Sequence, residues 1–179
     1  MNITRNLHRI NFFLPQEHRL NLFKVINSPQ FDYADIIWGG CTKKDQKNLQ
    51  IVQNFAAKSI TGNKKHDSAT ASLRKLKLLN LQQRRKLHES VFIHKALLKK
   101  SSPNLYQEYS NYFSKRNTRM ATQQKLRIPT HSTTKFKSSP LYRTIATWNH
   151  LPPNLPKDNA KLHKDHLQKH MIKTSYPPQ

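Results

Sequence analysis

The chain has 179 residues, a length that suits one domain of ordinary size or a domain with a tail. Apolar residues make up 35% of it, below the roughly 45–50% of typical globular domains, so we expect a modest core with much chain outside it. The formal net charge of +23 favours a polyanionic partner. One cysteine excludes an internal disulfide and a cysteine-rich zinc site, which fits a reducing intracellular compartment, nuclear or cytoplasmic. No apolar run approaches the roughly 20 residues that span a bilayer, so we expect no membrane partner.

The charge is distributed unevenly along the chain. Residues 1–62 carry 8 basic and 4 acidic side chains, a net charge of +4, whereas residues 63–179 carry 24 and 5, a net charge of +19. Most of the surface that would attract phosphate therefore follows Gly62.

The first sixty residues predict three helices. Pro15 can start a helix over 15–27, in which Leu20, Phe23 and Ile26 share one face. A short helix over 32–38 would be capped by Asp32 and stopped by the glycines at 39 and 40. The third runs from the capping pattern "TKKD" at 42–45 to Gly62.

The remainder predicts shorter helices and irregular chain. Ser68 or Thr70 would start a helix that ends near Leu78, and Asn80, with Gln83 three residues later, would cap a long helix to about Lys99. An aromatic stripe follows over 106–113, then "KLRIP" and "TKFKS" as two short strands around a polar loop. Residues 114–139 suit a flexible linker, and helices are expected within 140–151 and over 159–172.

These elements predict a mainly α fold: a small helical bundle, then a basic, partly irregular extension with a short β-hairpin and a C-terminal helix. The corresponding segments are 1–100 for the helical domain, 101–139 for the basic linker and 140–179 for the C-terminal helical segment. In the bundle, the stripe of Leu49, Val52, Ala56 and Ile60 is expected to pack against Leu87, Val91 and Leu98.

The residues that could carry catalysis or hold a metal do not form a recognised site. Asp32 and Asp35 are three residues apart at a helix start, not adjacent as in a polymerase carboxylate pair, so helix capping is favoured over metal binding. His163, His166 and His170 would share one face of a helix, for which a solvated basic face is favoured over a zinc site. Cys41 lacks a triad spacing. We expect no metal, no cofactor and no small-molecule substrate.

Clusters of basic residues are the remaining signal. Such side chains neutralise backbone phosphates without reading base sequence. The candidate nucleic-acid-binding residues are Arg84, Arg85, Lys86, Lys99, Lys100, Lys115, Arg116, Arg119, Lys125, Arg127, Lys135, Lys137 and Arg143. The stripe of Tyr106, Tyr109, Tyr112 and Phe113 could stack on bases, although core packing is favoured for it.

Five motifs occur in a fixed order along the chain: "FDYADIIWGG", "KKDQKNLQIVQNFAAKSITG", "LKLLNLQQRRKLHESVFIHKAL", "LRIPT" and "TWNHLPPNL". Their succession resembles the C-terminal portion of jockey-like reverse transcriptases from non-long-terminal-repeat retrotransposons. The positions that match the family pattern are Asp32, Tyr33, Trp38, Gly39, Leu49, Gln50, Gln53, Asn54, Ala56, Arg84, Arg85, His88, Trp148, Asn149, Leu151 and Pro152.

The resemblance implies a thumb region and the extension that follows the polymerase palm of an RNA-directed DNA polymerase. The paired catalytic aspartates of the palm have no counterpart in this sequence, so the chain is expected to be inactive alone. Its implied partner is an RNA template or an RNA–DNA hybrid held through phosphates. Two alternatives are a decayed transposon reading frame without a selected function and an unrelated basic structural protein of a ribonucleoprotein particle.

Overall fold

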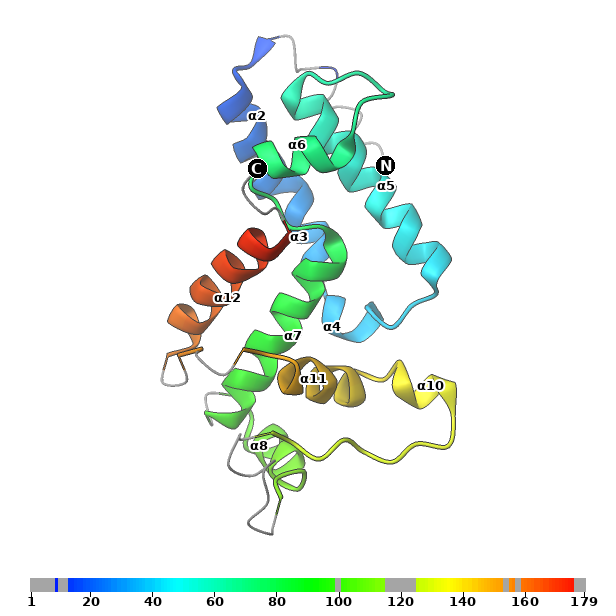
Figure 1. Ribbon diagram of the computed structural model, residues 1–179, viewed down its shortest axis with the longest axis vertical. Helices are drawn as coiled ribbons and strands as arrows, with labels where there is room; N and C mark the ends of the chain where they lie inside the picture. The colour runs from blue at the N-terminus through cyan, green and yellow to red at the C-terminus, as the bar shows by residue number, and fades with distance from the viewer. Residues whose placement is uncertain are drawn as a thin grey trace. The chain divides into compact units, whose positions relative to one another are not determined.

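The computed structural model describes Arg9 and residues 13–98, 101–114, 125–152, 155–156 and 159–175. The protein is mainly helical, as the sequence predicts, and the described residues form no strand (Figure 1). The elements in chain order are α2 Gln16–Leu22, the π-helical turn η2 Phe23–Asn27, α3 Ser28–Asp32, α4 Asp35–Trp38, α5 Lys43–Thr61, α6 Ala69–Lys75, α7 Leu81–Leu97, α8 Pro103–Ser110, α10 Thr134–Lys137, α11 Pro140–Asn149 and α12 Ala160–Ser175.

The chain divides into two compact units. The first comprises Met1–Asp35, Cys41–Arg84 and Ile172–Gln179, and the second comprises Ile36–Gly40 and Arg85–Met171. The three sequence segments 1–100, 101–139 and 140–179 stay predictions.

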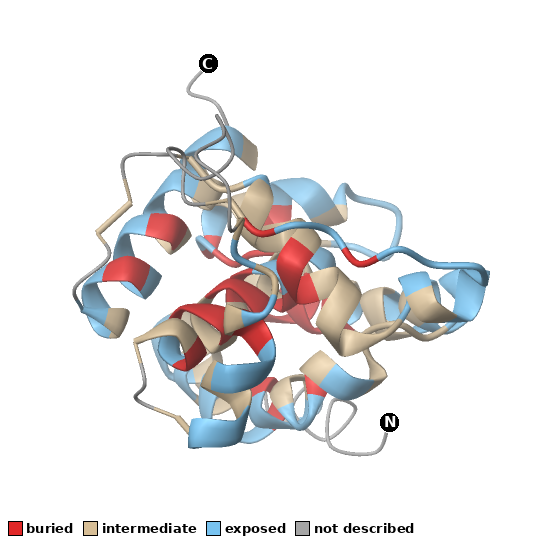
Figure 2. Cartoon of the chain, turned by 90° about the horizontal axis from the view of Figure 1, so that it is seen from below, coloured by how far each residue is buried: buried red, intermediate tan, exposed pale blue. Residues whose placement is uncertain are grey.

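The core of the first unit gathers α2, η2, α5 and α6. Ala56, Ala57 and Ile60 of α5 pack with Phe23 and with the leucines at positions 73, 76 and 78. The predicted partners of this stripe, Leu87, Val91 and Leu98, belong to the second unit, so that pairing stays a prediction. Within the first unit, the leucines of α6 and its following turn pack against α5. Buried residues, red in Figure 2, alternate along the helices with exposed ones in pale blue, the periodicity of amphipathic helices.

The N-terminal helical segment runs further than predicted and contains a π turn. The amide of Ser28 donates to the carbonyl oxygen of Phe23, a spacing of five residues that adds one residue to the turn. The face therefore shifts by one position: Asn27 is buried, while Ile26, predicted to be buried, is 42% exposed. Helical structure continues to Asp32, so Asp32 ends α3 and does not cap the next helix as predicted, which instead begins at Asp35.

The caps of the two long helices match the sequence patterns. Thr42 Oγ1 accepts from the amide of Asp45, and Gly62, with φ of 74°, ends α5. Asn80 Oδ1 accepts from the amide of Gln83 at 2.8 Å, and Gln83 Oε1 accepts in return from the amide of Asn80. This reciprocal pair is a capping box, which satisfies amides that the first turn of a helix leaves unpaired.

Polar side chains of α5 hold the turn before α7. Gln53, itself buried, donates from Nε2 to the carbonyl oxygen of Leu79 at 2.9 Å. Gln50 Oε1 accepts from the amide of Leu81 at 2.9 Å, while its Nε2 donates to Asn54 Oδ1 at 2.8 Å. The motif residues Gln50, Gln53 and Asn54 therefore fix the start of α7 against α5 within the first unit.

The core of the second unit gathers α7, α8 and α11. Ile93, Ala96, Tyr109, Leu126 and Ile145 form its buried cluster. The hydroxyl of Tyr109 lies 2.8 Å from Thr144 Oγ1, and burial raises the pKa of Tyr109. Core packing therefore accounts for this tyrosine of the aromatic stripe, and Phe113 is 39% exposed.

The predicted β-hairpin is not formed by its two segments. "TKFKS" forms the short helix α10, because Thr133 accepts from the amide of Phe136 and so caps a helical turn. "KLRIP" forms neither a helix nor a strand, and Leu126 makes an isolated antiparallel bridge to Phe113. The side chain of Asn149 makes two hydrogen bonds with the backbone of Leu126. Its Oδ1 accepts from the Leu126 amide, and its Nδ2 donates to the Leu126 carbonyl oxygen.

Candidate nucleic-acid interface

The two neighbouring arginines at the start of α7 are engaged within the protein. Arg84 forms a two-pronged ion pair with Asp32 in the first unit, with Nε to Oδ1 and Nη2 to Oδ2 both at 2.5 Å. Arg85 is buried in the second unit, and its guanidinium carbon lies 5.5 Å from the centre of the Trp38 ring. A cation over an indole face is a stabilising contact that leaves that face of the guanidinium covered. Of the "RRK" cluster, Lys86 alone is exposed.

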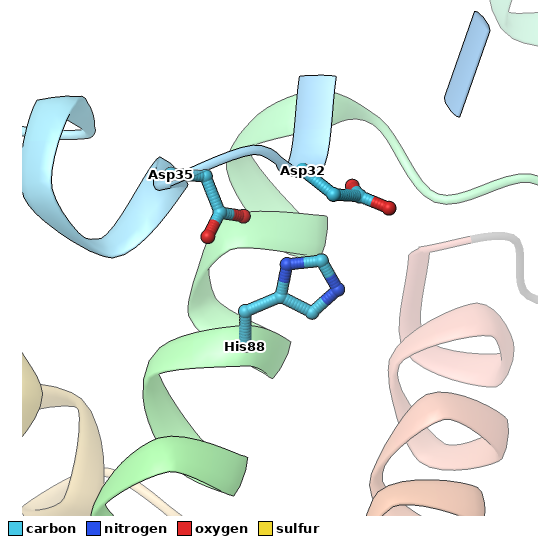
Figure 3. Close-up of side chains that lie close together, drawn as sticks. All are labelled: Asp32, Asp35 and His88. Carbon is cyan, nitrogen blue, oxygen red and sulfur yellow. The ribbon is translucent and has the colours of Figure 1, made fainter. Parts of the chain in front are cut away.

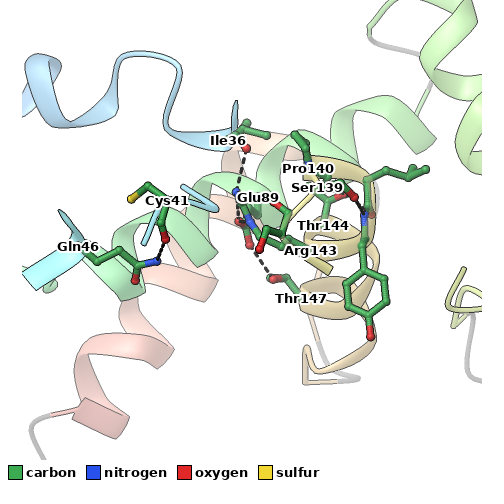
Figure 4. Close-up of polar contacts among 12 residues, drawn as sticks. Ile36, Cys41, Gln46, Glu89, Ser139, Pro140, Arg143, Thr144 and Thr147 are labelled. Atoms are coloured by element: carbon green, nitrogen blue, oxygen red, sulfur yellow. Dashed lines mark hydrogen bonds and ion pairs between the residues drawn. The ribbon is translucent and has the colours of Figure 1, made fainter. Parts of the chain in front are cut away.

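Arg143 of α11 is the centre of a partly buried polar network in the second unit (Figure 4). Its Nε and Nη2 donate to Glu89 Oε1 at 2.9 and 2.7 Å, and its Nη2 also donates to the carbonyl oxygen of Ile36. Thr147 donates to the other carboxylate oxygen, Glu89 Oε2, at 2.8 Å. The Glu89 side chain is only 7% exposed, so its charge depends on Arg143 for compensation.

Four predicted cations remain on or near the surface of the second unit. They lie on the segment 125–137, which we call the basic segment: Arg127, Lys135 and Lys137 are exposed, and Lys125 is half-buried. Lys99, Lys100, Lys115, Arg116 and Arg119 lie outside the described residues.

Aromatic and backbone contacts hold the basic segment against its own unit. The amide of Arg127 donates to the carbonyl oxygen of Tyr112 at 2.7 Å, and Leu126 is fully buried. Further along, His131 and Phe136 both meet the ring of Tyr142 edge-on, at 5.2 and 6.3 Å between ring centres. The segment is thus fixed at both ends, while its cationic side chains reach solvent.

Sequence reasoning missed other exposed cations. Among them, Lys43, Lys44 and Lys47 lie on the first turns of α5, and Lys161, Lys164, Lys169 and Lys173 lie on α12. Their signal was present in the helical periodicity, since none of these positions falls on the buried stripe of its helix.

The aspartates considered as metal ligands lie at the ends of two short helices, and one of the three α12 histidines is buried. Asp32 stands at the end of α3 and Asp35 at the start of α4 (Figure 3), and the Asp32 carboxylate is occupied by Arg84. His163 is buried, so the three histidines of α12 do not form the single solvated face that was predicted. His166 and His170 are exposed. Cys41 is half-buried, and its carbonyl oxygen accepts from Gln46 Nε2 at 3.0 Å.

No described helix combines the length and apolar character needed to cross a membrane. The chain matches no protein-family model, and the comparisons with curated proteins and with solved structures gave no match either.

Proposed function

We propose that the chain binds the phosphate backbone of RNA or of an RNA–DNA hybrid, as the thumb and following region of a jockey-like reverse transcriptase. The observation that carries this proposal is the exposed charge of the basic segment. Arg127, Lys135 and Lys137 reach solvent on a segment fixed by its own contacts, in a chain of net charge +23. Cations held on an anchored segment lose less conformational freedom when they meet phosphate.

The internal contacts of the motif residues support the family assignment. Within the first unit Asp32 pairs with Arg84, and within the second Trp38 covers Arg85. Each pair joins residues from two separate motifs, so residues that carry the resemblance also contact one another inside each unit.

The same contacts change which residues are proposed to meet nucleic acid. Arg84 pairs with Asp32, and Arg143 pairs with Glu89, so moving either arginine onto a phosphate would leave its carboxylate without that cation. The guanidinium of Arg85 lies over the ring of Trp38. The proposed interface therefore consists of Lys86, Lys125, Arg127, Lys135 and Lys137 among the residues described.

The test is a salt-dependent binding titration with a fluorescein-labelled RNA–DNA hybrid, single-stranded RNA and duplex DNA of equal length. The logarithm of the association constant should fall linearly with the logarithm of salt between about 50 and 200 mM, with a slope of about −0.9 per phosphate neutralised on a duplex. The triple variant Arg127→Ala, Lys135→Ala and Lys137→Ala should reduce the magnitude of that slope by up to about 3.

A matched control removes the same charge from the first unit. Lys24, Lys43 and Lys47 are all exposed, and their replacement by alanine should change the slope less than the triple variant of the basic segment. Equal losses in both variants would show that net charge alone governs affinity. Binding that does not respond to salt would contradict the proposal as a whole.

A further inference from the structure

Three near-parallel rings pack together inside the second unit. They come from three helices: His94 of α7, Trp148 of α11 and His163 of α12. The two imidazole rings are stacked with centres 4.1 Å apart and planes 10° apart, and Trp148 lies 6.1 and 6.2 Å from them. Both histidines are almost fully buried, at 2% and 1% exposure.

Both nitrogens of His163 have hydrogen-bond partners. Nδ1 lies 3.0 Å from the carbonyl oxygen of Pro156, and Nε2 lies 2.9 Å from Ser90 Oγ. Because a carbonyl oxygen only accepts, Nδ1 carries the proton and Nε2 accepts from the serine hydroxyl. The docked arrangement thus satisfies a neutral ring. Burial lowers the pKa of His163 and outweighs the carbonyl of Pro156, which acts in the opposite direction.

The ring of His163 makes up a large part of the fully buried side of α12. The buried residues of α12 are His163 and Leu167, and Leu162 beside them is 48% exposed. A helix normally docks through several aliphatic side chains, whose contribution does not vary with pH. Here one of two buried side chains can take a proton.

We propose that α12 is an acid-released helix: protonation at the stacked His94–His163 pair detaches it from α7 and α11. A proton on His163 would place a buried cation against the second imidazole, which could not then accept a proton of its own without facing a like charge. In the detached state His163 is hydrated and binds the proton freely.

Among the residues that the structure describes, no group around His163 offers a charge that would hold an imidazolium in place. The titratable group that faces it from α7 is His94. Glu89 of α7 and Arg143 of α11 are paired with each other, Trp148 is neutral, and residues 155, 156 and 159 carry no charge. On α12 itself Lys164, Asp165 and His166 are exposed, away from the buried side.

The direction of the pH effect follows from the lowered pKa. Above an ordinary histidine pKa of about 6.5, both states are neutral and docking does not vary with pH. As pH falls below that value the detached state gains a proton that the docked state lacks, so detachment grows by up to about tenfold per pH unit for each proton. The loss continues until the pH reaches the docked pKa.

The test uses hydrogen exchange of the full chain at about pH 7.5 and about pH 5.5, with rates corrected for the intrinsic effect of pH. Protection of amides in α12 should fall about tenfold if His163 alone takes a proton, and more steeply if both rings do. Amides of α5, whose buried residues include no ionisable side chain, serve as the internal reference and should keep their protection.

Three variants locate the effect. His163→Phe keeps a ring in the stack but cannot take a proton, so its α12 protection should not vary with pH. His94→Phe should retain about the tenfold loss that one proton causes. His166→Gln, at an exposed position of the same helix, should behave as the parent.

Two results would overturn the proposal: equal α12 protection at both pH values in the parent, or a pH-dependent loss that persists in His163→Phe. Should His163→Phe not fold, the C2 proton of His163 in the parent decides by nuclear magnetic resonance. A midpoint well below about 6.5 supports the proposal, and a midpoint at or above it refutes it.

Discussion

At the scale of single residues, the partner of an arginine decides whether it can serve a ligand. Arg143 and Arg127 have the same side chain and both lie in the second unit. Arg143 directs its guanidinium at Glu89 and a backbone carbonyl, whereas Arg127 is exposed. Moving Arg143 onto a phosphate would leave Glu89 buried with an unbalanced charge, at a cost of several kcal/mol. Exposed cations carry no such penalty.

Replacing Arg143 by alanine should therefore destabilise the second unit by about 3–5 kcal/mol, because it leaves the buried Glu89 carboxylate unpaired. Arg143→Lys keeps the charge but not the fork that reaches Glu89 and Ile36 together, so its cost should be smaller. Urea unfolding followed by Trp148 fluorescence in a Trp38→Phe background measures both values.

The contrast with Lys137→Ala provides the control, since Lys137 is exposed and its replacement should lie within about 0.5 kcal/mol of the parent. An Arg143→Ala variant as stable as Lys137→Ala would mean that the network does not stabilise the unit.

The residue-level roles were the least accessible from the sequence. The positive charge of the run "RRK" is plain from the sequence, but Asp32, the ion-pair partner of Arg84, lies 52 residues away. Nothing local distinguishes Arg84 from Lys86, which is exposed two residues later on another face of the same helix. Likewise the burial of His163 depends on α7 and α11, so helical spacing alone placed it wrongly on a solvated face with His166 and His170.

At the scale of elements, local chemistry fixed most helix ends. Thr42, Gly62 and Asn80 act within a few residues of themselves, so their patterns predicted the ends of α5 and the start of α7 correctly. The π turn at 23–27 was not predictable from apolar periodicity, because its extra residue changes the period itself. α10 was mistaken for a strand since four residues are too few to show a period.

Gly62 and Gly40 are each required for a different reason, the first for its backbone conformation and the second for the space around it. Gly62 has φ of 74° and open space around it, so Gly62→Ala should cost about 1–2 kcal/mol through backbone strain alone. Gly40 has no such φ, but an added Cβ would lie 2.2 Å from the carbonyl oxygen of Ser138, so Gly40→Ala must displace backbone.

Asparagine at each position separates the two causes, because it tolerates the left-handed conformation better than alanine but is larger. Thermal melts should show Gly62→Asn less harmful than Gly62→Ala, and Gly40→Asn more harmful than Gly40→Ala. The reverse order at either site would contradict the cause assigned to it.

At the scale of the whole molecule, the succession of predicted elements indicated correctly that the fold is mainly helical, but it did not identify the partners of α5 in the first unit. The sequence paired the stripe of α5 with that of α7, two long amphipathic patterns. In the structure α5 packs with the shorter α6 and its following turn, which "LRKLKLL" encodes with leucines at positions 73, 76, 78 and 79. A short segment can supply the apolar side chains that cover a long helix, and it has too few residues to show a period from which that packing could be predicted.

The net charge of +23 acts on every part of the chain at once, and it predicts that salt stabilises the folded state. Raising NaCl from about 0.01 to about 0.1 M shortens the Debye length from about 30 to about 10 Å, which screens repulsion between basic side chains held close in the fold. Each 1 kcal/mol gained should raise the melting temperature by about 2–4 °C for a chain of this size.

Replacing the exposed Lys43 and Lys47 by glutamate lowers the net charge and places acids near the start of α5, so this variant should melt higher at low salt and respond less to added salt. Circular dichroism melts across the salt series measure both effects. A melting temperature that falls with salt, or an equal salt response in parent and variant, would show that charge repulsion does not limit the stability of this fold.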